Sequence, residues 1–139
     1  MTHKLYLALG SNLGNREENI RRALALIDER VGSVYRVSSP METDPVGFSS
    51  PNKFINLVCL VHTMMSPMSC LRETHKIEQE LGRTQKTLCT DGQLLHSDRT
   101  IDIDLLTYDD ITMDTPELTL PHPRMKGRDF VMRPLEEIS

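Results

Sequence analysis

The segment Arg99–Leu106, with the sequence RTIDIDLL, alternates apolar and polar side chains over most of its length. A period of two residues is typical of a β-strand, on which successive side chains point to opposite faces. Asp102 and Asp104 therefore share one face, with Cα atoms roughly 6–7 Å apart at the rise of a strand. Ile101 and Ile103 point to the other face, which we expect to pack on a core.

Two neighbouring carboxylates on one strand face have two interpretations. They repel each other unless a cation lies between them, and their hard oxygen atoms suit Mg²⁺. Arg99 lies three residues before Asp102, where it can reach an anion held by such a metal. An edge strand with a solvated acidic face explains the same pattern, so this segment alone leaves both interpretations open.

The chain around this strand predicts three further strands, over residues 4–9, 34–38 and 54–61. Asn15 is a predicted N-cap, and the apolar residues after it recur at helical spacing until Gly32. Ser66 and Pro67 begin a second predicted helix, which ends at Gly82. We expect residues 39–53 and 111–120 to be irregular and residues 130–135 to form a last strand or extended segment.

The order strand, helix, strand, strand, helix, strand is the split βαβ pattern. It predicts an α+β, ferredoxin-like sandwich in which helices pack on one face of a mainly antiparallel sheet. The length of 139 residues suits one compact domain, so we assign residues 1–139 to a single domain. We expect a monomer or a weak homodimer.

The composition disfavours nucleic-acid-binding, membrane-spanning and secreted proteins. A net charge of −4 disfavours broad electrostatic capture of nucleic acid or an anionic membrane, so an anionic ligand would need a local basic cluster. No apolar run is long enough to span a bilayer, and the N-terminus lacks the pattern of a signal peptide. Cys59, Cys70 and Cys89 are odd in number and lack zinc-type spacing, which predicts reduced thiols in a cytoplasmic protein.

Several further segments are candidates for a binding site, and each also has an ordinary structural explanation. The turn at 10–15 resembles neither a P-loop nor a dinucleotide fingerprint. Asn56 interrupts an apolar run, and a buried amide needs partners from either the backbone or a ligand. His75 and Glu78 share one helix face. The local cations are Arg124, Lys126 and Arg128, which suit a phosphate or form a solvated turn.

Six segments in order, covering nearly the whole chain, resemble 6-hydroxymethyl-7,8-dihydropterin pyrophosphokinase of folate biosynthesis. They are Leu9–Gly14, Thr43–Gly47, Phe54–Asn56, Ile77–Arg83, Arg99–Asp104 and Leu120–Phe130. The pairing of Arg-x-x-Asp-x-Asp with the later Pro-His and Arg segment is the most specific part. The resemblance favours metal binding by the acidic pair.

The resemblance implies transfer of pyrophosphate from ATP to the pterin hydroxymethyl oxygen, which leaves AMP. It implies that Asp102 and Asp104 hold two Mg²⁺ ions. It places phosphate-binding and catalytic roles on Arg83, Arg99 and Arg128, and it places the nucleotide along His75, Glu78 and His122. The implied pterin pocket consists of Thr43, Pro45, Val46, Phe54, Asn56 and Phe130.

The sequence departs from the family pattern around the loop 83–98, which the resemblance implies closes over the site. Ser97 and Asp98 precede Arg99 where many relatives carry Gly-Pro, and the chain has no tryptophan. The chain also stops soon after Ile138, where relatives usually continue. These departures keep two alternatives open, namely a non-catalytic pterin- or nucleotide-binding module of the same fold and a different metal-dependent phosphoryl or nucleotidyl transferase.

Overall fold

The computed structural model describes residues 2–44, 53–82 and 100–139. The predicted acidic strand is present and is the fifth of seven described strands. The elements in chain order are β1 (His3–Ser11), α1 (Arg16–Arg30), β2 (Ser33–Val37), β3 (Met41–Thr43), β4 (Phe54–Thr63), α2 (Pro67–Glu80), β5 (Asp102–Tyr108), β6 (Met113–Asp114), β7 (Thr119–Leu120), the 3-10 helix η1 (Met125–Gly127) and α3 (Asp129–Ile138).

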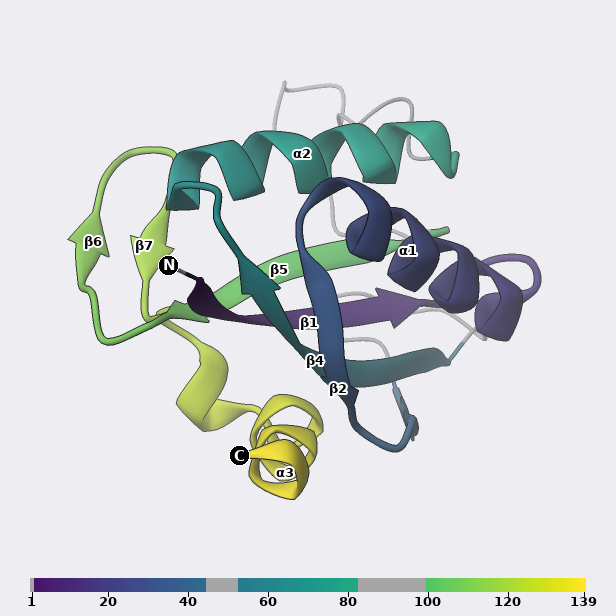
Figure 1. Ribbon diagram of the computed structural model, residues 1–139. Coiled ribbons are helices and arrows are strands. Elements are labelled where there is room, and N and C mark those ends of the chain that lie inside the picture. The colour runs from purple at the N-terminus through teal and green to yellow at the C-terminus, as the bar shows by residue number, and fades with distance from the viewer. Residues whose placement is uncertain (1, 45–52, 83–99) are drawn as a thin grey trace, which may run out of the picture.

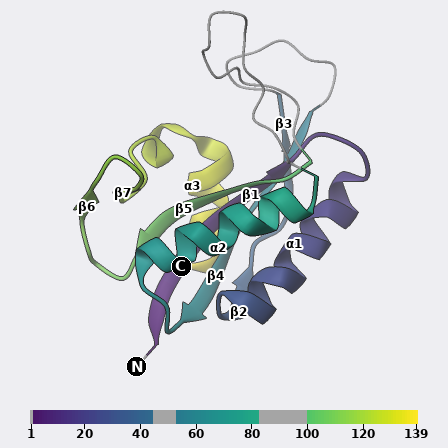
Figure 2. The same ribbon diagram turned by 90° about the horizontal axis from the view of Figure 1, so that it is seen from above.

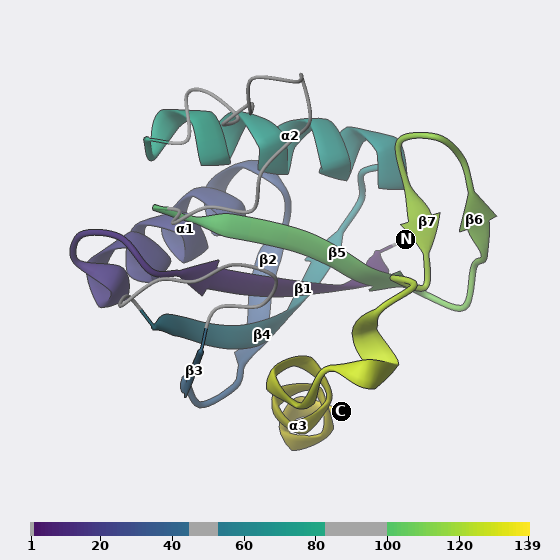
Figure 3. The same ribbon diagram turned by 180° about the vertical axis from the view of Figure 1, so that it is seen from behind.

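The main sheet has the strand order β2-β4-β1-β5, and β3 pairs with β4 beside this path. Every pairing in this sheet is antiparallel. The order and directions confirm the predicted split βαβ pattern, and the run at 54–61 lies in a central strand as its apolar composition predicts. β5 lies at the edge of the sheet beside β1, as the view from behind shows (Figure 3).

The helices α1 and α2 lie side by side on one face of the sheet (Figures 1 and 2). Both predicted N-caps are present, because the side chain of Asn15 accepts from Glu18 N and that of Ser66 accepts from Ser69 N. The apolar stripe of each helix is buried against the sheet. These stripes include Ile20, Ala23 and Ile27 of α1 and Cys70, Thr74 and Ile77 of α2.

The prediction of a last strand over residues 130–135 is wrong, because this segment belongs to the helix α3. α3 also corrects the expectation that the helices share one face, since it lies on the face opposite α1 and α2 (Figure 1). Val131, Leu135 and Ile138 are spaced as on one helix face and pack in a second apolar cluster with Val58 and Leu106. The short length of the segment and Pro134 within it hid this period in the sequence.

Two segments predicted to be irregular contain short strands instead. Residues 41–43 form β3, which pairs with the start of β4 from Phe54 to Asn56. Residues 113–114 and 119–120 pair with each other as the small sheet of β6 and β7. These strands have only two or three residues, which is too short for a hydrophobic period to be recognised. Among the described residues, no helix is long and apolar enough to cross a membrane.

Candidate active site

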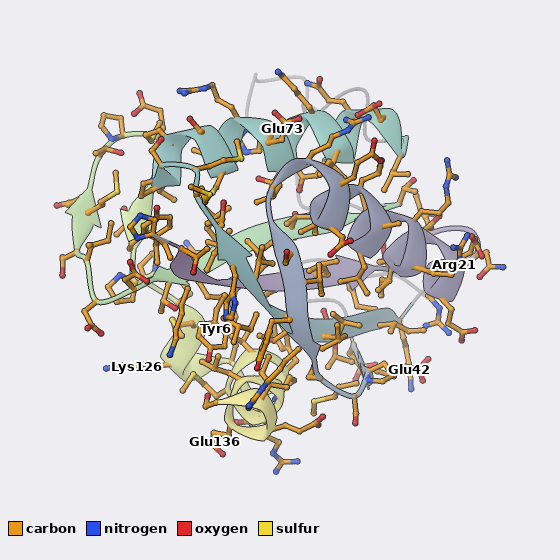
Figure 4. All side chains as sticks on the ribbon, in the orientation of Figure 1. Tyr6, Arg21, Glu42, Glu73, Lys126 and Glu136 are labelled. Carbon is orange, nitrogen blue, oxygen red and sulfur yellow. The ribbon has the colours of Figure 1, made fainter. Side chains whose placement is uncertain are left out.

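The sheet face that α3 covers changes from apolar to polar along the strands. Under α3, Val58 of β4 and Leu106 of β5 are buried, with Tyr6 and Ala8 of β1 packed against them. Figure 4 shows Tyr6 between the sheet and α3. Toward the other end of the same strands, the residues on this face are Gly10, Asn56, Asp102 and Asp104, because alternate residues share a face and Gly10 is paired with both Asn56 and Asp102. The polar end of this face is the candidate site.

Gly10 leaves room for the side chain of Asn56. A Cβ atom at Gly10 would lie 2.9 Å from Asn56 Oδ1 and 3.4 Å from Phe54 Cδ1. Asn56 Nδ2 donates a hydrogen bond of 2.7 Å to Thr43 Oγ1 and a longer one of 3.4 Å to Met41 O. Three residues of the predicted pterin pocket, Thr43, Phe54 and Asn56, are therefore gathered at one point of the sheet.

Strand β1 lies between the acidic pair on β5 and the Asn56 amide on β4. Ile101, Ile103 and Leu105 of the acidic segment are buried in the core between the sheet and the helices α1 and α2, as predicted. Asp102 and Asp104 are only partly buried on the opposite face. Mg²⁺ is often held by one or two carboxylates, with water and substrate phosphates completing its coordination. The hard oxygen donors of Asp102 and Asp104 fit such an ion.

A turn containing His122 brings cationic residues to the same end of the site. His122 N donates to Leu106 O of β5 at 2.8 Å, and Arg124 N donates to His122 Nδ1 at 3.2 Å. Because Nδ1 accepts this bond, the neutral imidazole carries its proton on Nε2. Burial lowers the pKa of His122, as do the charges of Arg128 and Arg124, whereas the charge of Asp102 raises it. These interactions place His122, Arg128 and Asp102 near one another.

Phe130 and Arg128 are neighbours at the start of α3. The guanidinium carbon of Arg128 lies 5.6 Å from the centre of the Phe130 ring, a distance typical of a cation–π contact. Both side chains are partly buried. The contact restrains a flat aromatic face next to a permanent positive charge.

The two predicted nucleotide residues on α2 differ in their surroundings. His75 is exposed, whereas Glu78 is buried with 7% of its surface accessible. Glu78 Oε2 accepts a 2.8 Å hydrogen bond from Ile103 N, the amide between the two aspartates. A weak signal for this contact is present in the sequence, because Glu78 directly follows Ile77 on the buried stripe of α2.

Four predicted site residues, Arg83, Arg99, Pro45 and Val46, lie outside the described residues, as does the loop 83–98. Two other residues of the site were not predicted to have a role of their own. Gly10 has no side chain that suggests chemistry, and only its contact with Asn56 shows why a glycine is required. The sequence predicted Arg124 only as one member of the cationic cluster at 124–128. In the structure, Arg124 has a specific contact, because its backbone N–H donates to His122 Nδ1.

Known proteins resemble this chain along nearly its whole length. A 2-amino-4-hydroxy-6-hydroxymethyldihydropteridine pyrophosphokinase of Porphyromonas gingivalis is 44% identical over 136 residues, which cover 97% of this chain and 90% of that protein. The protein of the same name from Bacillus subtilis is 40% identical over 139 residues, covering 99% of this chain and 79% of that protein.

The fold is shared with solved structures of lower sequence identity. A crystal structure of Plasmodium falciparum HPPK-DHPS superimposes with a TM-score of 0.78 at 17% identity, covering 99% of this chain and 42% of that chain. The sequence pattern of the 7,8-dihydro-6-hydroxymethylpterin-pyrophosphokinases matches residues 6–139. The chain therefore belongs to the 7,8-dihydro-6-hydroxymethylpterin-pyrophosphokinase family.

Proposed function

We propose that this chain transfers a pyrophosphoryl group from ATP to the hydroxymethyl oxygen of 6-hydroxymethyl-7,8-dihydropterin, giving AMP and the pterin diphosphate in folate biosynthesis. One observation carries the proposal. In a chain that matches this family over residues 6–139, Asp102 and Asn56 flank Gly10 on the part of the sheet face that has polar residues. The carboxylate pair that we propose to bind metal and the amide that we propose to bind the pterin edge are thereby separated only by strand β1.

Asp102 and Asp104 are the proposed ligands of two Mg²⁺ ions. Bound Mg²⁺ would neutralise phosphate charge and lower the pKa of the acceptor hydroxyl group. In the transfer, the hydroxymethyl oxygen forms a bond to the β-phosphorus of ATP while the bond from that phosphorus to the oxygen retained by AMP breaks. The hydroxyl proton must leave in this step, and Asp102 is the acceptor that we propose for it.

The pterin is proposed to bind where Thr43, Phe54 and Asn56 meet. The bond from Asn56 Nδ2 to Thr43 Oγ1, at 2.7 Å, holds the amide in one orientation, which suits recognition of the amide-like edge of a pterin. Phe130 is proposed to stack on the ring, since its position beside Arg128 restrains it. Pro45 and Val46 complete the proposed pocket.

The triphosphate is proposed to bind on the cationic side. Arg128 is always charged and its planar donors match phosphate oxygens, and we propose the same role for Arg83 and Arg99. His122 is proposed to donate from Nε2 as a neutral imidazole, because its Nδ1 is occupied by Arg124 N. His75 is exposed on α2, and we propose that it borders the nucleotide together with Glu78. Transfer of this kind depends mainly on alignment and charge neutralisation.

We also propose a cytoplasmic location and a monomer or weak homodimer that binds neither nucleic acid nor membranes. Both described cysteines, Cys59 and Cys70, are free and buried, which agrees with a reducing compartment. The net charge of −4 supports the absence of general electrostatic binding to anionic polymers and surfaces. Size-exclusion chromatography with light scattering measures the oligomeric state.

The reaction is tested by incubating the protein with ATP, Mg²⁺ and 6-hydroxymethyl-7,8-dihydropterin and identifying the products by mass spectrometry. We expect equal amounts of AMP and pterin diphosphate, and we expect EDTA to prevent their formation. Asp102→Ala and Asp104→Ala should abolish turnover, while the control Asp114→Ala, at an exposed position on β6, should not. Formation of ADP would indicate ordinary kinase chemistry, and binding of both ligands without products would indicate a non-catalytic binding module.

A further inference from the structure

Glu78 joins the helix α2 to the edge strand of the sheet. It is 7% exposed, and its Oε2 atom accepts a 2.8 Å hydrogen bond from Ile103 N. The neighbouring residue Ile77 and the earlier residue Thr74 are fully buried in the core, so the part of α2 that carries Glu78 is firmly anchored. A carboxylate that accepts from a backbone amide makes a stronger hydrogen bond than a neutral acceptor does.

The amide that Glu78 binds belongs to the residue between the two aspartates. β5 pairs with β1 on one side, and in the described part of the chain it has no strand on its other side. On an edge strand, alternate N–H groups point away from the sheet, and Ile103 N–H is one that finds its partner on a helix instead. The side chain of Ile103 is 4% exposed in the core, so this residue is held both by its side chain and by its backbone.

We propose that Glu78 is a positioning residue that fixes the backbone between Asp102 and Asp104 and thereby sets the separation of their carboxylates. This inference rests on the proposed function, in which the two aspartates hold the metal ions. Ligands of a metal must be held within about 0.5 Å of their productive positions, and groups behind the ligands usually provide this restraint. The hydrogen bond from Ile103 N to Glu78 supplies such a restraint through the backbone of β5.

Three substitutions of Glu78 separate the effect of its hydrogen bond with Ile103 N from the effect of its negative charge. Glu78→Gln keeps the length of the side chain and an oxygen that accepts from Ile103 N, but it removes the charge. Glu78→Asp keeps a carboxylate but shortens its reach by one methylene group, and Glu78→Ala removes the acceptor. The matched control is Gln79→Ala, because Gln79 is the next residue on α2 and is exposed.

The first measurements are Mn²⁺ binding by electron paramagnetic resonance and hydrogen exchange of the Ile103 amide, neither of which requires turnover. We expect Glu78→Ala and Glu78→Asp to speed exchange at Ile103 and to weaken Mn²⁺ binding by about 10- to 100-fold, the usual range for residues behind metal ligands. The Mg²⁺ concentration for half-maximal turnover should rise in parallel. Glu78→Gln should restore most of the affinity, and Gln79→Ala should match the wild type.

Two results would overturn the inference. One is a lower melting temperature of Glu78→Ala with unchanged Mn²⁺ affinity, which would make the role of Glu78 only structural. The other is a higher KM for ATP in Glu78→Ala with unchanged Mn²⁺ affinity and unchanged slow exchange at Ile103, which would make Glu78 a nucleotide contact and not a positioning residue. If Glu78→Ala fails to fold, Glu78→Asp decides the question by the same measurements.

Failure of the proposed function has a different signature. Unchanged Mn²⁺ binding in both Asp102→Ala and Asp104→Ala would remove the metal site from the acidic pair, whatever Glu78 does. If the aspartate variants lose Mn²⁺ and the Glu78 variants keep it, the metal site stands and only the positioning role of Glu78 is refuted.

Discussion

Replacing Gly10 by alanine tests whether the close approach of Asn56 to the backbone of β1 orients the amide that we propose to bind the pterin. The new Cβ atom would lie 2.9 Å from Asn56 Oδ1, closer than real Cβ atoms come to an oxygen, and 3.4 Å from Phe54 Cδ1. The Asn56 side chain must therefore move, and its bond of 2.7 Å to Thr43 Oγ1 resists that movement. We expect overpacking to reduce the free energy of unfolding by about 1–3 kcal/mol.

The larger effect should be on pterin binding. If the displaced amide no longer meets the pterin edge, the loss of its hydrogen bonds costs about 1–3 kcal/mol, or roughly 5- to 150-fold in Kd. Isothermal titration calorimetry with the pterin, in the presence of Mg²⁺ and a non-hydrolysable ATP analogue, measures this change. Unfolding in urea measures the stability of the same samples, so loss of folded protein can be separated from loss of affinity.

Gly127→Ala is the matched control, because a Cβ atom at Gly127 would meet no atom within 4 Å. It should change neither pterin affinity nor stability by more than a few tenths of a kcal/mol, as is usual for surface substitutions. The reasoning is refuted if Gly10→Ala binds the pterin as the wild type does. It is also refuted if both glycine variants lose affinity equally, because the contact with Asn56 would then be irrelevant.

Three further predictions concern single groups. Burial and the charges of Arg128 and Arg124 lower the pKa of His122 from 6.5, so NMR titration should find it below that value. As pH falls, the unfolded chain therefore takes up the proton on His122 before the folded chain does. The contribution of His122 to the free energy of unfolding is present above about pH 6.5 and is lost as pH falls through the folded-state pKa. Urea unfolding of His122→Gln should lack this pH dependence. Burial raises the pKa of Cys59 to about 12, so iodoacetamide at pH 8 should modify this thiol only after unfolding, as peptide mass mapping would show. Asn15→Ala removes the acceptor for Glu18 N at the start of α1, and calorimetry should find a melting temperature lower by roughly 3–4 °C for a loss of about 1 kcal/mol; an unchanged melting temperature would mean that this cap contributes nothing.

The parts of the fold that were predicted correctly depend on local patterns. The alternation in β5 predicted which face carries Asp102 and Asp104, and the buried side chain of Ile103 confirms it. The N-cap residues Asn15 and Ser66 predicted where two helices begin. A burial pattern and a cap are readable from the sequence because both involve residues only a few positions apart.

The C-terminal segment shows where such patterns fail. Residues 130–135 looked like an extended segment because six residues with Pro134 among them show no clear helical period. The helix α3 forms there because Val131 and Ile138 cover the apolar half of a sheet face, next to Val58. That apolar surface exists only after β1, β4 and β5 have paired, so the local sequence does not reveal the helix.

The sequence by itself determined the order of the four long strands and of the helices α1 and α2, the face of the acidic pair and, through six ordered segments, the resemblance to one enzyme family. The tertiary structure decided which residues meet. In the structure, Asn56 lies against Gly10 and donates to Thr43, and Glu78 accepts from the Ile103 amide between the two aspartates. These contacts join residues 13 to 46 positions apart. A contact at such separation depends on strand register and on the packing of α2 against β5, which arise from the whole fold rather than from either segment alone.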